Sequence, residues 1–145
     1  MKPKTTWVAV ANARLARVLV HAGAGQGLQA QSKMTLHAVE APKPRDKAGV
    51  GHSIAGPARN AVEQKGEQEQ AERDFAQTIA DALFHAQQRE EFDRLIIVAG
   101  PHMLGVLRTF LAPDVAQRVI GEIAKDLTHV STEAIGEHLG DLIYV

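Results

Sequence analysis

The chain contains no cysteine among its 145 residues, so disulfide bonds and thiol chemistry are both excluded. Aromatic side chains are few, with one Trp, one Tyr and four Phe, so Val, Ile, Leu and Ala must build most of the core. No window approaches about 18 uninterrupted apolar residues, and we therefore expect no transmembrane helix. The first residues lack the apolar stretch of a signal peptide, so we expect a cytoplasmic protein.

An excess of charge of one sign is also missing. The chain has 16 basic and 17 acidic side chains, which leaves a formal net charge of −1. Nothing global therefore attracts it to nucleic acid or to an anionic membrane, although local basic patches stay open. Residues 1–39 contain neither Asp nor Glu. Two-metal nucleases need clustered carboxylates, normally beginning on the first strand, so this absence argues against a nuclease.

Signatures of metal binding and of nucleophilic catalysis are missing as well. The seven histidines are scattered and show no His-Glu-x-x-His or other ligand spacing. There is no Gly-x-Ser-x-Gly motif. The glycines at 23, 25 and 27 join two expected strands, whereas a dinucleotide site needs a strand followed by a helix. We predict no metal site, no cofactor and no catalytic residue, which favours a protein that is not an enzyme.

Hydrophobic periodicity predicts one α/β domain over residues 1–145. Three strands come first, over 6–11, 15–22 and 28–37, and the short turns between them are typical of an antiparallel meander. The third strand alternates between apolar and polar residues, as a strand with one wet face does. Such a strand lies near a sheet edge, which permits a homodimer through strand pairing.

A long loop is expected next, over 38–66, because this segment contains several prolines and glycines and has little periodicity. A long helix follows over 67–91, with an apolar stripe from Ala71 to Ala86. The rest of the pattern is a strand over 95–99 buried on both faces, a helix from Pro101, a short helix over 113–118, a strand over 119–127 and a last helix capped by Ser131.

Short signatures stand in order along this pattern: Asn12–Val18, Pro44–Gly49, Phe75–Ala76, Leu95–Pro101 with Leu104–Arg108, and Lys125–Thr128. The ordered set resembles the bacterial host attachment protein family over nearly the full chain. That family is similar to the middle domain of archaeal and eukaryotic peptide chain release factors. The resemblance implies a ribonuclease-H-like mixed sheet of about five strands, in which the antiparallel meander is followed by helix, strand, helix, strand and helix.

The release-factor domain carries Gly-Gly-Gln in a glycine-rich loop before its long helix, where the motif places a water at the peptidyl-tRNA ester. Here the glycine-rich loop Ala48–Gly56 occupies that place, but Gly-Gly-Gln occurs nowhere in the chain. We therefore do not expect release activity. The resemblance implies a non-catalytic, translation-associated module that binds the ribosome or tRNA in rescue, stalling or hibernation.

Candidate RNA- or ligand-binding residues lie in the long loop and in the turn after the buried strand. Basic side chains of the loop suit phosphates, and its glycines permit close backbone approach. The turn lies at the carboxyl end of a strand, where α/β sheets gather ligands. The candidates are Lys43, Arg45, Lys47, Gly49, Gly51, His52, Arg59, His102 and Arg108. A solvated loop and a purely geometric turn are the structural alternatives.

Two other functions stay open. The family name implies a factor required for bacterial attachment to host cells, and the absence of adhesin features makes that role indirect. The second is a hydrolase that uses the loop to position a water on an unknown ester, for which His52 or Arg45 would be needed.

Overall fold

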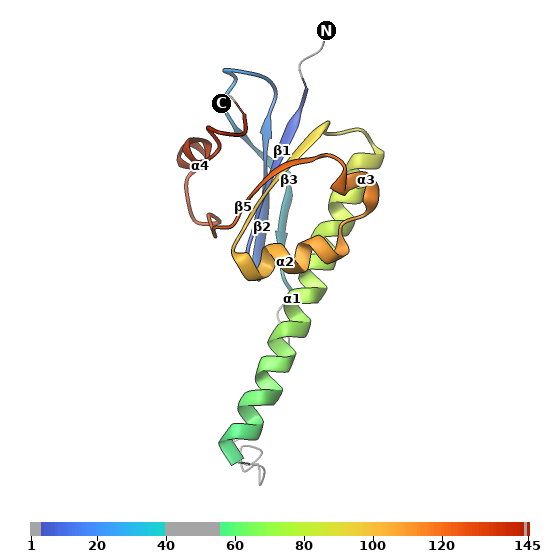
Figure 1. Cartoon of the computed structure of the whole chain (residues 1–145), viewed down its shortest axis with the longest axis vertical. Coiled ribbons are helices and arrows are strands. Elements are labelled where there is room, and N and C mark those ends of the chain that lie inside the picture. Colours follow the sequence, from blue (N-terminus) through green and yellow to red (C-terminus); the bar gives the residue numbers. More distant parts are fainter. Residues whose placement is uncertain (1–3, 40–55, 144) are drawn as a thin grey trace.

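The computed structural model describes residues 4–39, 56–143 and 145, and the side chains of these residues except those of 56–61. Five strands form one sheet in the order β3-β2-β1-β4-β5 (Figure 1). They are β1 (Thr6–Ala11), β2 (Leu15–His21), β3 (Gln29–His37), β4 (Arg94–Ala99) and β5 (Val119–Ile123). β2 is antiparallel to β1 and β3, whereas β1, β4 and β5 run parallel. The predicted ribonuclease-H-like mixed sheet is confirmed.

Helices cover both faces of this sheet. They are α1 (Gly56–Gln88), α2 (Pro101–Phe110), α3 (Pro113–Ala116) and α4 (Thr132–His138). Figure 1 shows α1, α2 and α3 on one face and α4 on the other. Each interface holds its own apolar cluster. β1 and β4 send alternate side chains into both clusters, so both strands are buried on both faces, as the apolar run of β4 predicts.

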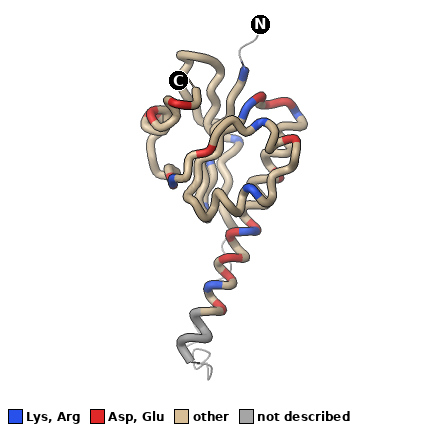
Figure 2. The backbone as a smooth tube through the Cα atoms, viewed as in Figure 1, with Lys and Arg blue, Asp and Glu red and all other residues tan. Residues whose placement is uncertain are grey.

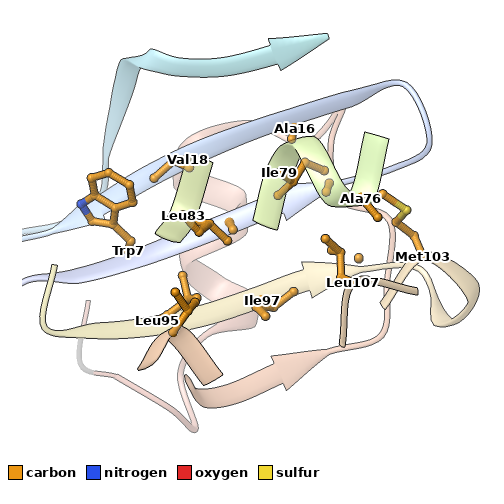
Figure 3. Packing of buried hydrophobic residues seen from close by; sticks show 14 of the residues in the cluster. Trp7, Ala16, Val18, Ala76, Ile79, Leu83, Leu95, Ile97, Met103 and Leu107 are labelled. Atoms are coloured by element: carbon orange, nitrogen blue, oxygen red, sulfur yellow. The ribbon is translucent and has the colours of Figure 1, made fainter. Parts of the chain in front are cut away.

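The first cluster joins α1 and α2 to the sheet (Figure 3). Trp7 of β1 packs on Phe92 with ring centroids 5.0 Å apart. Ile79 and Leu83 of α1 lie over the sheet and are almost fully buried. From Phe75 onward the predicted stripe of α1 is therefore buried or, at Ala82, half-buried, whereas its first expected member, Ala71, is exposed because α1 has left the sheet there.

The loop predicted over 38–66 is wrong over its second part, because α1 begins at Gly56. Gly56 and Pro57 open the helix, and Pro suits a first helical turn. Residues 58–65 are mostly Ala, Glu, Gln and Lys, which have high intrinsic helix propensity. This propensity favours a helix even though the segment has no apolar stripe. Residues 40–55 lie outside the described part of the chain.

β3 lies at an edge of the sheet, as predicted, but its expected alternation is interrupted. The register with β2 shifts between Ala16 and Val18, which pair with Leu36 and Gln31. Such an irregularity changes the face that later side chains take. Consequently Met34 and Leu36 pack on the first cluster while Leu28 packs on the second. Homodimers through this edge stay a prediction.

Several strand and helix ends differ from the expected bounds by one to four residues, and α1 and β5 are two examples. α1 ends at Gln88 and Glu90 follows with a positive φ of 57°, so the helix does not reach residue 91. The strand predicted over 119–127 ends at Ile123. Ser131 caps α4 as predicted, because its Oγ accepts a hydrogen bond from the backbone N–H of Ala134 at 3.2 Å.

The amino-terminal part of α1 projects beyond the sheet, and we call residues 56–74 the arm (Figure 1). Residues 62–71 are all exposed, and burial begins at Phe75. At 1.5 Å per residue the arm is roughly 28 Å long. None of the helices in the described ranges combines the length and apolar character needed to cross a membrane.

Proline substitutions should distinguish the contribution of the arm to stability from that of the body of the domain. Gln68 lies in the arm and Gln77 lies where α1 covers the sheet, and both side chains are exposed. We expect Gln77→Pro to lower the free energy of unfolding by about 3 kcal/mol or more. Gln68→Pro should change it by less than about 0.5 kcal/mol, because residues 62–71 are all exposed and the contacts of Glu72 and Arg73 lie beyond the substituted position.

Urea unfolding followed by the fluorescence of the buried Trp7, the single tryptophan of the chain, measures both values. Equal destabilisation by the two substitutions would show that the arm is part of the cooperative core.

Candidate functional site

An open cleft of about 410 Å³ lies at the base of the arm. Its walls are the β1–β2 turn, the point where α1 leaves the sheet, the β4–α2 connection and the segment after β5. β1, β4 and β5 are parallel, so the cleft lies at their carboxyl ends, where α/β sheets usually bind ligands. The lining residues are Asn12, Ala13, Arg14, Glu72, Gly100, Pro101, His102, Met103 and Asp126.

Asn12 fixes the β1–β2 turn and joins it to the segment after β5. Its Oδ1 accepts hydrogen bonds from the backbone N–H groups of Arg14 and Leu15, both at 2.8 Å. Its Nδ2 donates to Thr128 Oγ1 at 2.9 Å and to Asp126 Oδ2 at 3.4 Å. Two backbone donors on one side and two oxygen acceptors on the other determine the amide orientation.

Asp126 completes this network as an acceptor. Its Oδ1 accepts from the backbone N–H of Thr128 at 3.0 Å and from Thr128 Oγ1 at 2.6 Å. Burial raises the pKa of Asp126, but the hydrogen bonds from Thr128 and Asn12 and the nearby His129 lower it by more, so the pKa lies below its usual value. The carboxylate is therefore ionised at neutral pH, whereas a general acid needs a raised pKa.

Two contacts between α1 and α2 fix the direction of the arm at its base. His102 Nε2 lies 2.8 Å from Glu72 Oε2. That oxygen is buried and accepts no hydrogen bond of good geometry from the described residues, so the two side chains are joined by close approach alone. The guanidinium of Arg73 lies 5.3 Å from the ring centroid of Phe110, within the range of a cation–π contact.

His102 is the predicted site residue that the structure places in the cleft. Its imidazole is largely exposed, with 69% of the side-chain area accessible, so it contacts Glu72 and solvent at once. Gly100 and Pro101 lie beside it and start α2 without a side-chain cap, which leaves the first N–H groups of the helix unbonded by any capping side chain.

Arg108 lies outside the cleft lining and is held by Glu122 of β5. Its Nε donates to both carboxylate oxygens, at 3.0 and 3.2 Å, and its Nη2 donates to Oε1 at 2.7 Å. These bonds raise the pKa of Arg108, and they lower the pKa of Glu122 against the opposing effect of burial. The structure therefore does not bring Arg108 and His102 to one site, and RNA binding by Arg108 stays a prediction.

The remaining predicted residues come before or at the start of the arm. Six of them lie outside the described residues: Lys43, Arg45, Lys47, Gly49, Gly51 and His52. The backbone of Arg59 lies in the arm. Asn12, Asp126 and Thr128 were predicted only as parts of the short signatures, and the contact of Glu72 was not predicted. An Asn directly after a buried strand was the available signal for the first of these.

The described part of the arm is acidic (Figure 2). Residues 62–74 hold two basic side chains and five acidic ones, a net charge of −3: Lys65 and Arg73 against Glu63, Glu67, Glu69, Glu72 and Asp74. Gln70 Nε2 donates to Asp74 Oδ1 at 2.8 Å, one turn along the helix, which supports the exposed arm. Among the described residues no group of three His, Asp or Glu side chains is placed to hold a metal ion.

The sheet order, the helices on both faces and the cleft define an open α/β domain with a projecting helix. The chain belongs to the family described as "Protein required for attachment to host cells", whose family model matches residues 7–139. The predicted family is thereby confirmed. No curated protein matches the chain.

Among solved structures, the chain is similar to an archaeal translation termination factor, aRF1, with 8% sequence identity and a TM-score of 0.47. The match covers 94% of this chain and 38% of the termination factor, so the chain spans well under half of that protein. At this distance the likeness carries no argument about activity.

The depressed pKa of Asp126 predicts how its contribution to stability varies with pH. The ionised form stabilises the fold above the unfolded pKa of about 3.9, and this contribution is lost as pH falls through the lower folded value. We expect Asp126→Asn to lower the melting temperature at about pH 7 and to lower it much less at about pH 2.

Thermal unfolding followed by circular dichroism at both pH values measures the difference, with Asp141→Asn, an exposed carboxylate near the end of the chain, as the matched control. An equal loss at both pH values would contradict the network described for Asp126.

Proposed function

We propose that this chain is a non-catalytic, translation-associated module that binds the ribosome or tRNA and acts in rescue, stalling or hibernation. The observation that carries the proposal is the arm. The rest of the domain is stabilised by two buried apolar clusters. The arm, in contrast, buries no side chain between 62 and 71.

A projecting helix that adds nothing to the core of its domain is suited to binding a partner. Helical stability in proteins comes mostly from packing, and in the part of the arm whose side chains are described, residues 62–71 are all exposed and form no buried apolar stripe. Its base is fixed by the Glu72–His102 and Arg73–Phe110 contacts. A helix roughly 28 Å long can reach into a confined site that the body of the domain cannot enter.

The distribution of charge supports contact through one end of the arm. The basic residues Lys43, Arg45, Lys47 and Arg59 come before it or in its first turns, while residues 62–74 carry a net charge of −3. With an overall charge of −1, affinity for phosphates has to be local. The acidic stretch suits basic protein surfaces, and a ribosome presents both kinds of surface.

A non-catalytic role agrees with the chemistry of the cleft. Asp126 is ionised and held as an acceptor by Thr128 and Asn12. Glu72 and His102 are engaged with each other. The alternative of an ester hydrolase depends on His52 and Arg45, which lie outside the described residues.

Co-sedimentation with ribosomes at low and moderate salt tests the proposal. We expect the chain in the ribosomal fraction at low salt, and expect the triple variant Lys43→Gln, Arg45→Gln and Lys47→Gln to bind less. The slope of log affinity against log salt should fall by roughly two, because fewer counterions are released. The matched control removes the same charge elsewhere, through Lys33→Gln, Arg89→Gln and Lys125→Gln.

The Gln68→Pro variant adds a test of the arm itself. It should lose binding while the core keeps its stability, because only the direction and rigidity of the arm change. Absence of the unmodified protein from the ribosomal fraction at both salt concentrations, in growing and in stressed cells, would remove the proposal.

A second candidate is an indirect role in bacterial attachment to host cells, which the description of the family favours. We expect deletion of the gene to reduce attachment while the protein stays inaccessible to a membrane-impermeant amine reagent in intact cells. The same reagent should label the protein in lysed cells, and a known surface protein serves as the positive control. Labelling in intact cells would instead support direct contact with the host.

A further inference from the structure

A second open cleft, of about 590 Å³, lies at the other end of the sheet. It is formed where β4 and β5 begin and where α1 ends, so it faces away from the cleft at the base of the arm. Fifteen residues of α1 separate Glu72 from Gln87, or roughly 22 Å along the helix. The lining residues are Lys4, Gln87, Asp93, Arg94, Asp114, Gln117, Arg118 and Ile120.

Three cations line this second cleft, and none of them has an ion-pair partner in the described part of the chain. Among the described residues, no carboxylate lies within 4.0 Å of the charged nitrogens of Lys4, Arg94 or Arg118. Arg94 and Arg118 are half-buried. A charge that loses part of its hydration without a counter-charge is unfavourable, so this arrangement favours an anion from outside the chain.

Neutral acceptors hold the two guanidinium groups in place. Arg94 Nε donates to Thr6 Oγ1 at 3.1 Å, and Thr6 is fully buried. With its amide turned toward Arg118, the Gln87 side-chain oxygen accepts from Arg118 Nη2 at 3.0 Å and from Arg118 Nε at 3.2 Å, and gives up its bond from Gln88 Nε2. Gln87 is also buried. Each guanidinium is thus oriented without being neutralised, and keeps further N–H donors for a ligand.

The carboxylates of the second cleft restrict the size of the anion. Asp93 Oδ2 accepts the backbone N–H of Thr5 at 2.9 Å, so this carboxylate helps to build the wall. Asp114 lies in the first turn of α3. The ionised lining sums to +1, from three cations and two carboxylates. A long polyanion would meet both carboxylates, whereas a single compact phosphate can contact the arginines alone.

We propose that this second cleft binds the phosphate group of a small phosphomonoester. Arg94 and Arg118 grip the phosphate oxygens, since planar guanidinium groups match phosphate geometry with paired hydrogen bonds. Lys4 adds charge at the rim. The volume of the cleft falls within the range of small-molecule sites, and Gln117 and the partly exposed Ile120 line the space left for the organic part. This site is independent of the arm and of the proposed ribosome contact.

Titration of the 15N-labelled full chain with phenyl phosphate, followed by NMR, tests this site. We expect shifts of the Nε–H signals of Arg94 and Arg118 and of the Gln87 amide, with little change at His102. Arg118→Gln should weaken binding about tenfold, the effect of losing a charge-assisted hydrogen bond. Lys4→Gln, at an exposed position before β1, should weaken it less and leave folding intact.

Arg89→Gln is the matched control, because Arg89 is exposed, pairs with Glu91 at 3.2 Å and lies outside the lining. It should bind phenyl phosphate like the unmodified chain. Equal binding of benzoate would overturn the preference for phosphate. Absence of shifts in the cleft at millimolar phenyl phosphate would overturn the site, as would equal loss in Arg89→Gln and Arg118→Gln. Weakened ribosome binding by Arg118→Gln, without phenyl phosphate binding, would assign the cleft to RNA instead.

Discussion

The parallel pairing of β1 with β4, from Thr6 opposite Arg94 to Ala11 opposite Ala99, sets the course of the whole chain. Parallel neighbours cannot be joined by a tight turn, so the chain has to return across the sheet before β4 begins. α1 makes that return and covers the first apolar cluster on its way. Both clefts follow from the same pairing. Because β1 and β4 are parallel, their carboxyl ends lie together at one cleft and their amino ends at the other.

The return across the sheet needs only part of α1. A six-residue strand spans roughly 20 Å, and the helical segment from Phe75 to Gln88 covers about the same length at 1.5 Å per residue. The remaining residues form the arm. The Glu72–His102 and Arg73–Phe110 contacts stand at the boundary between the two parts. The arm is therefore an extension of a structural helix, with its direction determined by packing in the body.

The strands and helices of the body could be predicted from the sequence because the pattern of apolar residues reflects burial. The apolar run of β4 and the Ser131 cap of α4 were both predictable from local residue types. The start of α1 was not, because its exposed residues 62–71 lack the apolar stripe that periodicity detects. The Arg108–Glu122 pair and the Glu72–His102 contact depend on how α2 lies against β5 and α1. The place of His102 in the cleft was predictable because His102 follows β4 in the sequence. The place of Glu72 was not, because it depends on the path of α1 across the sheet.

The continuity of α1 makes the domain a lever with its fulcrum at Glu72 and Arg73. Gly56 lies sixteen positions before Glu72, so a force applied there acts through roughly 24 Å of helix and is opposed by the shorter segment that lies on the sheet. The resulting torque is delivered to α2, through His102 and Phe110. A load on the arm therefore reaches both ends of α2, through His102 beside the cleft at its amino end and through Phe110 at its last position.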